Sequence, residues 1–184
     1  KCKLSSRVGY DKLESYKNIL PTRFSGWQIS WLGNGKLSLV RPPASDNSLP
    51  SLFMLEIQSA ALQNVLNSKK NLALTWSGSG QKLLYSYIDL ITKKDGLYFM
   101  DLADRLEVPL NAPLSASSCA WSIDDKAIYC AGKDSFAHID TSSPGTPPEE
   151  IPVTGSSAVS ANAINLLLTS AEDYLIFKNS QDAK

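Results

Sequence analysis

The chain has 184 residues, 43% of them hydrophobic and 20% charged, and its 18 basic and 18 acidic side chains leave no net charge. This length suits a single domain with a buried core, and the composition excludes wholesale disorder. The charge balance, without a local basic cluster, argues against a nucleic-acid binder. No apolar run reaches the ~18 residues of a membrane span. Because the chain begins at Lys1, we expect any signal peptide or membrane anchor to lie upstream.

The first segment with a structural preference is Tyr10–Leu20, YDKLESYKNIL. It suits either a turn or two of helix or the outer strand of a preceding sheet. Residues 1–25 are therefore expected to form an N-terminal segment or a partial repeat.

From residue 29 onward one pattern recurs four times: an apolar run, a polar turn and a second apolar run, as in a β-hairpin. Tryptophans stand at positions 31, 76 and 121, at equal intervals of 45 residues. In the fourth copy Thr169 is expected to take the tryptophan's place, after 48 residues. The four expected hairpins are Ile29–Val40, Leu74–Tyr85, Cys119–Cys130 and Leu166–Phe177.

Two more strands follow most hairpins. The expected third strands are Ser51–Ile57, Gly96–Leu102 and Ser135–Thr141, and the expected outer strands are Leu62–Leu66, Leu106–Leu110 and Glu149–Thr154. Four short strands in about 45 residues is the repeat unit of a propeller blade. The sequence predicts an all-β chain: a β-propeller with about four visible blades of four-stranded antiparallel sheets, as an incomplete ring or a fragment of a larger propeller. The expected blades are 26–69, 70–113, 114–158 and, in part, 159–184.

The repeats WSGSGQK and WSIDDK resemble the TolB-like, PD40-type (WD40-like) propeller repeat. The segments CAWSIDDKAIYC and DYLIFKNSQD look like parts of membrane-anchored, outward-facing bacterial propeller proteins. The resemblance covers nearly the whole chain, and its motifs are structural. It implies a propeller fold and an extracytoplasmic location, at the cell surface or in the periplasm, more than it implies an activity.

The repeated aromatic residues Trp31, Trp76 and Trp121 are expected to pack between blades, with a sugar- or peptide-binding platform as the alternative. Trp27 lies outside the repeat and is expected to be the more exposed tryptophan.

The turn residues are expected to form solvated tips, and no D-x-D-x-D pattern suggests calcium. These residues are Gly35, Gly80, Asp124, Asp125 and Asp173.

Cys119 and Cys130 are equidistant from a hairpin tip at Asp124 and Asp125. Directly opposed residues have Cα atoms about 4.5–5.5 Å apart, a separation that a disulfide can bridge. We therefore predict a disulfide between them, with two buried thiols as the alternative; the disulfide would indicate an oxidising compartment. Cys2 is left without a partner in this prediction.

No catalytic residue, cofactor site or metal site is predicted. The only histidine, His138, lies in an expected strand without a nucleophile elbow nearby, and no phosphate-binding loop or zinc-ligand spacing is present.

The ligand-binding residues remain unknown at this stage. The excursions Arg41–Pro50 and Ser142–Glu150 are expected to be exposed connectors, or alternatively the rim of a binding face. The leading hypothesis is a non-catalytic module that binds a protein, peptide or envelope polymer, and oligomers are compatible with it. Two others stay open: the gating propeller of a serine-peptidase-type hydrolase, and a structural subunit of a surface or secretion assembly.

Overall fold

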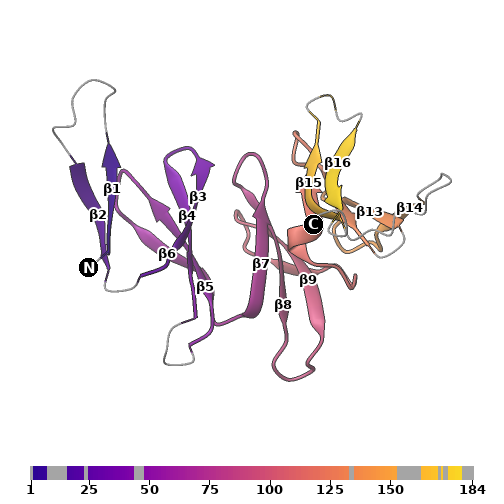
Figure 1. The fold of residues 1–184 in the computed structure, drawn as a ribbon, viewed down its shortest axis with the longest axis horizontal. Helices are drawn as coiled ribbons and strands as arrows, with labels where there is room; N and C mark the ends of the chain where they lie inside the picture. Colours follow the sequence, from indigo (N-terminus) through magenta and orange to yellow (C-terminus); the bar gives the residue numbers. More distant parts are fainter. Residues whose placement is uncertain are drawn as a thin grey trace. The chain divides into compact units, whose positions relative to one another are not determined.

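The computed structural model describes residues 2–7, 16–22, 25–43, 48–132, 135–152, 163–169, 171 and 174–179. Over these residues the chain forms antiparallel sheets, with one short 3-10 turn and no α-helix (Figure 1). None of the described residues forms a helix long and apolar enough to cross a membrane. The chain divides into two compact units, Lys1–Lys69 and Lys70–Lys184.

The first unit contains a two-stranded and a four-stranded sheet. The strands of the first sheet are β1 (Cys2–Arg7) and β2 (Tyr16–Thr22), and those of the second, in spatial order, are β3 (Gln28–Gly33), β4 (Lys36–Arg41), β5 (Ser51–Glu56) and β6 (Leu62–Leu66). Alternate positions of β4 and β5 supply the buried core, because successive side chains of a strand point to opposite faces. Leu37, Leu39 and Leu55 form this core together with Ile19.

The helical alternative for Tyr10–Leu20 is wrong where the structure describes it. Residues 16–22 form β2 and pair with β1, and residues 10–15 lie outside the described residues. Cross-strand pairing with β1 satisfies the backbone here, so tertiary context overrides the weak local helix preference.

The second unit contains two four-stranded sheets and a hairpin. The first sheet is β7 (Lys70–Trp76), β8 (Lys82–Ile88), β9 (Asp95–Asp101) and β10 (Glu107–Pro109); the second is β11 (Cys119–Trp121), β12 (Ala127–Ala131), β13 (Ser135–Asp140) and β14 (Glu149–Pro152). The hairpin is β15 (Ala163–Leu168) and β16 (Leu175–Asn179), and the 3-10 turn η1 (Ala116–Ser118) precedes β11.

A shared core joins the two four-stranded sheets of this unit. Leu84, Leu97 and Phe99 of the first sheet pack with Ile128 and Ile139 of the second. On the other face of the second sheet, Ala120 and Ala131 pack against Leu166 of β15. Neighbouring four-stranded sheets that pack face to face in sequence order have the arrangement of propeller blades.

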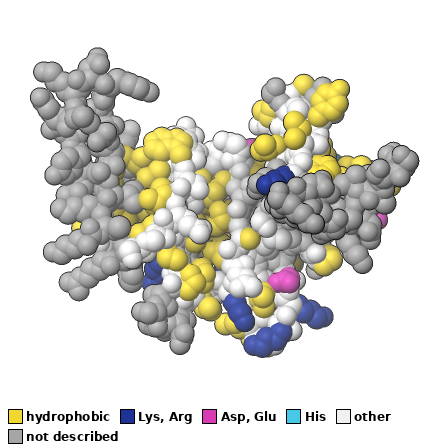
Figure 2. Space-filling view, viewed as in Figure 1, with side chains coloured by type: hydrophobic (Ala, Val, Ile, Leu, Met, Phe, Trp, Pro, Cys, Tyr) yellow, Lys and Arg dark blue, Asp and Glu magenta, His cyan; other side chains and the backbone are white. Residues whose placement is uncertain are grey.

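The β15–β16 hairpin carries exposed apolar side chains, visible over these strands in Figure 2. The side chains of Leu167, Tyr174 and Ile176 are all more than half exposed.

Candidate functional site

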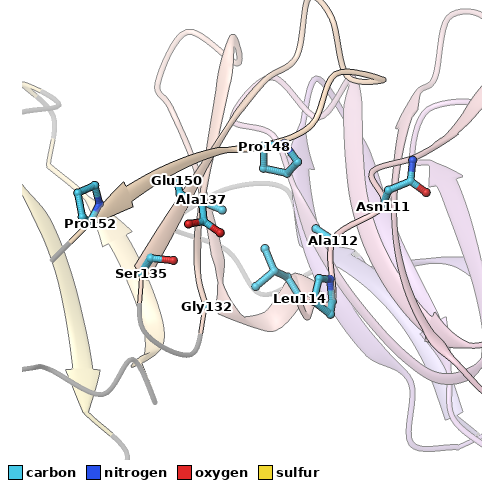
Figure 3. Close-up of a pocket in the computed structure, with 10 residues that line it drawn as sticks. Asn111, Ala112, Leu114, Gly132, Ser135, Ala137, Pro148, Glu150 and Pro152 are labelled. Carbon is cyan, nitrogen blue, oxygen red and sulfur yellow. The ribbon is translucent and has the colours of Figure 1, made fainter.

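A five-residue segment, Asn111–Ser115, links β10 to η1, and we call it the connector. A groove of about 860 Å³ lies beside it. We call this hollow the connector groove; its lining residues are Asn111, Ala112, Pro113, Leu114, Gly132, Ser135, Ala137, Pro148, Glu150 and Pro152. Figure 3 shows the connector on one side of the groove and β14 on the other.

The groove is hollow because a row of small side chains runs across the second sheet of this unit, from β11 to β13. One row of directly paired residues runs Cys119, Cys130, Ala137 and Glu150. The side chains of the two cysteines and the alanine are short, so they leave an open space next to Glu150 on the outer strand β14.

Gly132 brings the backbone close at the floor of the same groove. A Cβ atom there would lie 3.0 Å from the carbonyl oxygen of Ser135 and 3.6 Å from a methyl group of Leu114. A larger residue would therefore push the end of β12 away from β13.

The two adjacent glutamates of β14 face opposite sides of the sheet, because strand side chains alternate. The carboxylate of Glu149 lies 3.4 Å from Nδ1 of His138, whose ring is 5.1 Å from that of Tyr129. Glu150 lines the groove instead, and Figure 3 shows its carboxylate beside Ala137. Within the described part of the chain, its carboxylate has no hydrogen-bond or ion-pair partner.

Two smaller hollows border the other side of the connector. One, of about 420 Å³, is lined by Tyr98 and Pro109, and the other, of about 310 Å³, by Tyr87 and Ser115. The rings of Tyr87 and Tyr98 stack with centroids 4.8 Å apart. The connector thus runs between an aromatic surface and the connector groove.

The third member of this stack, Tyr85, is fully buried, and its hydroxyl donates a hydrogen bond to Glu107. Burial raises the pKa of Tyr85 above its ordinary value of 10, and the bond to Glu107 raises it further. A buried tyrosine whose ionised form is disfavoured in this way stays protonated when exposed tyrosines ionise.

A tyrosine titration followed at 295 nm tests this environment. Between pH 9 and 12, Tyr85→Phe is expected to leave the tyrosinate absorbance of the folded protein unchanged, whereas in denaturant it removes one of seven ionising tyrosines. Because the folded-state pKa is raised, the stabilising contribution of Tyr85 is complete below pH 10 and is lost as the pH rises above it. Near-UV circular dichroism checks that the protein stays folded. A smaller absorbance change in the folded variant would contradict the assignment.

The predicted cysteine pair lies directly across the β11–β12 hairpin, in the expected register. The Cα atoms of Cys119 and Cys130 are 4.0 Å apart and their sulfur atoms 2.12 Å apart. Both side chains are buried. Cys2 pairs with Thr22 through the backbone, and its side chain lies outside the described residues.

The repeated tryptophans do not share one environment. Trp121 lies 6.3 Å from the ring of Phe99, and its Nε1 donates to the carbonyl of Thr75, so it packs between two sheets of the second unit. Trp76 is half-buried.

The expectation for the other two tryptophans is wrong. Trp31 is 66% exposed, whereas Trp27 is half-buried beside the first unit's core, 5.8 Å from the ring of Phe53. The difference lies in what each ring contacts: Trp27 packs against the core of the first unit, and Trp31 is not among the residues of that core.

Thr169 does not occupy the place of a tryptophan. Ser77, Ser122 and Thr169 each donate their backbone N–H to the carbonyl five residues ahead, and the hydroxyl of each accepts the N–H of that same residue. The threonine is therefore equivalent to these two serines. Leu168, paired with Leu175 as Trp121 is with Ile128, takes the tryptophan's place.

Asp125 is not a solvated tip. Only 8% of it is exposed, and its carboxylate accepts hydrogen bonds from the backbone N–H groups of Gly78 (2.8 Å) and Ser79 (3.1 Å) in the preceding repeat. Its carbonyl accepts a bond from Nζ of Lys82. The turn therefore clamps two sheets of the second unit together.

The neighbouring Asp124 is exposed as expected. Its carboxylate accepts hydrogen bonds from the backbone N–H of Lys126 and from the hydroxyl of Ser122 within its own turn, which lower its pKa to about 2. Asp173 lies outside the described residues. Among the residues that are described, no three His, Cys, Asp or Glu side chains are grouped to hold a metal ion.

Of the two excursions, Ser142–Glu150 is largely exposed, and its end supplies Pro148 and Glu150 to the groove. In Arg41–Pro50, residues 44–47 lie outside the described residues. Sequence reasoning missed the connector itself. Its signal was the proline spacing in PLNAP, since β10 ends at Pro109 and proline at position 113 has no N–H to donate to a further strand pair.

Comparison with known proteins leads to the fold rather than to a family. No protein-family model matches the chain, and no curated protein matches its sequence. Solved structures do match it. TolB from Acinetobacter baumannii has a TM-score of 0.62 and 15% identity over 91% of this chain and 41% of TolB.

Two further structures are similar. The propeller domain of a protease from Pyrococcus furiosus has a TM-score of 0.53 and 16% identity over 68% of this chain and 43% of that one. A gluconolactonase from Xanthomonas campestris has a TM-score of 0.54 and 15% identity over 90% of this chain and 59% of the gluconolactonase. The chain spans less than two thirds of each of these proteins. At such identities the likeness shows the fold alone: this is a β-propeller chain with TolB-like structural neighbours.

Proposed function

We propose that the chain is a non-catalytic propeller module that recognises a protein, peptide or envelope polymer through the connector groove. In this proposal residues 1–184 form one propeller region. Its blades are residues 26–69, 70–113 and 114–158, and residues 1–25 and 159–184 form partial blades. The observation that carries the proposal is the groove itself: an open hollow of about 860 Å³ whose walls are polar and apolar in nearly equal parts, built on paired strands.

The non-catalytic part of the proposal is supported by the placement of the only histidine. His138 lies at ion-pair distance from Glu149 and beside the ring of Tyr129, in the row of the sheet that faces away from the groove. The extracytoplasmic part is supported by the closely opposed cysteines Cys119 and Cys130.

Site-directed photo-cross-linking tests the binding function. A benzophenone amino acid replaces Asn111 at the groove in one variant and, as a matched control in the same unit, Ile91 in another. Ile91 is 90% exposed and lies in the β8–β9 turn, where Figure 2 shows basic side chains. We expect one defined partner to be cross-linked from position 111 and not from 91, and the purified partner to bind the unmodified chain.

Two results would overturn the proposal. One is a partner that is cross-linked equally from positions 111 and 91, or a purified partner that does not bind the unmodified chain. The other is turnover of an ester, lactone or peptide substrate by the purified chain that His138→Ala abolishes.

A further inference from the structure

We infer that the connector groove selects an extended peptide segment carrying an arginine or lysine side chain, with Glu150 as its counter-charge. This inference rests on the proposed function and adds the chemistry of the ligand. It starts from the charge of the groove: among its described lining residues, Glu150 is the only charged one.

The carboxylate is free to bind. The two glutamates of β14 differ in this respect, since Glu149 faces His138 at 3.4 Å, whereas Glu150 has no ionic or hydrogen-bond partner within the described residues. Its partner across the strands is the short, buried Ala137, so nothing in that row covers it. An unpaired carboxylate over an apolar floor favours a cation that brings its own aliphatic stem.

Two neutral polar groups accompany the carboxylate. The amide of Asn111 and the hydroxyl of Ser135 also line the groove, and neither side chain has a hydrogen-bond partner within the described part of the chain. Amide and hydroxyl groups can donate to and accept from a peptide backbone. The groove therefore offers groups for a main chain as well as for one basic side chain.

The shape of the groove favours an extended segment. Its walls include Pro113, Leu114, Pro148 and Pro152, and Figure 3 shows Leu114 and Glu150 projecting into the space between the connector and β14. Addition of a strand to the edge of β14 is disfavoured, because proline at position 152 has no N–H to donate. The ligand therefore lies in the groove and not along the sheet edge.

Peptide titration followed by NMR tests the inference with the full chain. The probes are acetyl-Ala-Pro-Arg-Pro-Ala-amide and the same peptide with citrulline, a neutral isostere, in place of arginine. The backbone amides of Leu114, Gly132 and Ala137 report on the groove. We expect the arginine peptide to shift these signals and to bind about three- to fivefold more tightly than the citrulline peptide at low salt, with the preference falling as salt is added.

Two charge-neutralising variants of one strand separate the role of Glu150 from a general charge effect. Glu150→Gln is expected to abolish the preference for arginine, and Glu149→Gln, the matched control on the opposite face, to retain it. Both positions are exposed, and the spectra themselves show that the fold is kept.

Each other outcome has a defined meaning. Equal binding of both peptides at the groove, or a preference that survives Glu150→Gln, overturns the inference and leaves the proposed function standing. If no signal at the groove shifts but the cross-link from position 111 still forms, the inference is likewise overturned and the proposed function stands. Absence of both the shifts and the cross-link overturns the inference and the proposed function together.

Discussion

Asp125→Gly is expected to lower the free energy of unfolding by about 2–4 kcal/mol, because it removes two hydrogen bonds to a buried carboxylate. These are the bonds from the N–H groups of Gly78 and Ser79, which connect the second sheet of the unit to the first. Glycine keeps the left-handed backbone of this position, where φ is 58°. The equivalent position of the preceding repeat is already a glycine, Gly80, with φ of 67°.

Urea denaturation measures the effect, and two variants control it. Asp125→Asn keeps one acceptor oxygen and is expected to lose about half as much. Asn34→Gly changes another left-handed turn residue, with φ of 48°, and is expected to shift stability by less than about 0.5 kcal/mol. If Asp125→Gly cost no more than Asn34→Gly, the clamp would not hold the two sheets together.

Reduction of the predicted disulfide between Cys119 and Cys130 is expected to lower the free energy of unfolding by about 2–4 kcal/mol, since the bond restricts the unfolded chain. Intact mass and thiol titration of the unfolded, non-reduced protein should find one free thiol among three cysteines. Peptide mapping should then show the link across the β11–β12 hairpin.

A Cys2→Ser variant isolates the pair. It should contain no free thiol, and reduction should destabilise it as much as the original chain. Coincident denaturation curves before and after reduction, or two free thiols in this variant when prepared under oxidising conditions, would contradict the disulfide. The proposal of an extracytoplasmic location would lose its support with it.

The strands were predictable because their signals are local. Apolar runs separated by turn residues placed the outer strand β6 at Leu62–Leu66, as observed. The register of β11 with β12 followed from the position of the turn, because in a hairpin the tip determines which residues face each other. The repeated serine after the tryptophan also has a local purpose, since the hydroxyl of Ser77 or Ser122 closes its own turn.

Residues whose partners lie elsewhere in the chain were misjudged. The error over Thr169 is of another kind, because its hydrogen-bond partner is local. The interval of 48 residues put Thr169 in a tryptophan's place, whereas the four hairpin segments laid over one another set Leu168 against the tryptophans, and the turn hydrogen bonds show that Thr169 is equivalent to Ser122. Asp125 looked like any polar turn residue, because its partners lie more than 45 residues earlier. Trp31 was expected to be buried and is exposed, and Trp27 was expected to be exposed and is half-buried, since burial depends on what covers a side chain and not on its place in the repeat.

The sequence by itself determined the all-β character, the order of the hairpins and the opposition of Cys119 and Cys130, because each depends on alternation and turns within a few residues. Only the tertiary structure decided where a ligand could bind. The connector groove joins Asn111–Leu114 to residues of β13 and β14, and it exists because a row of short side chains across separate strands leaves space under Glu150. Such a space depends on which residues pair across strands and on how two sheets pack, and neither is encoded in any single segment.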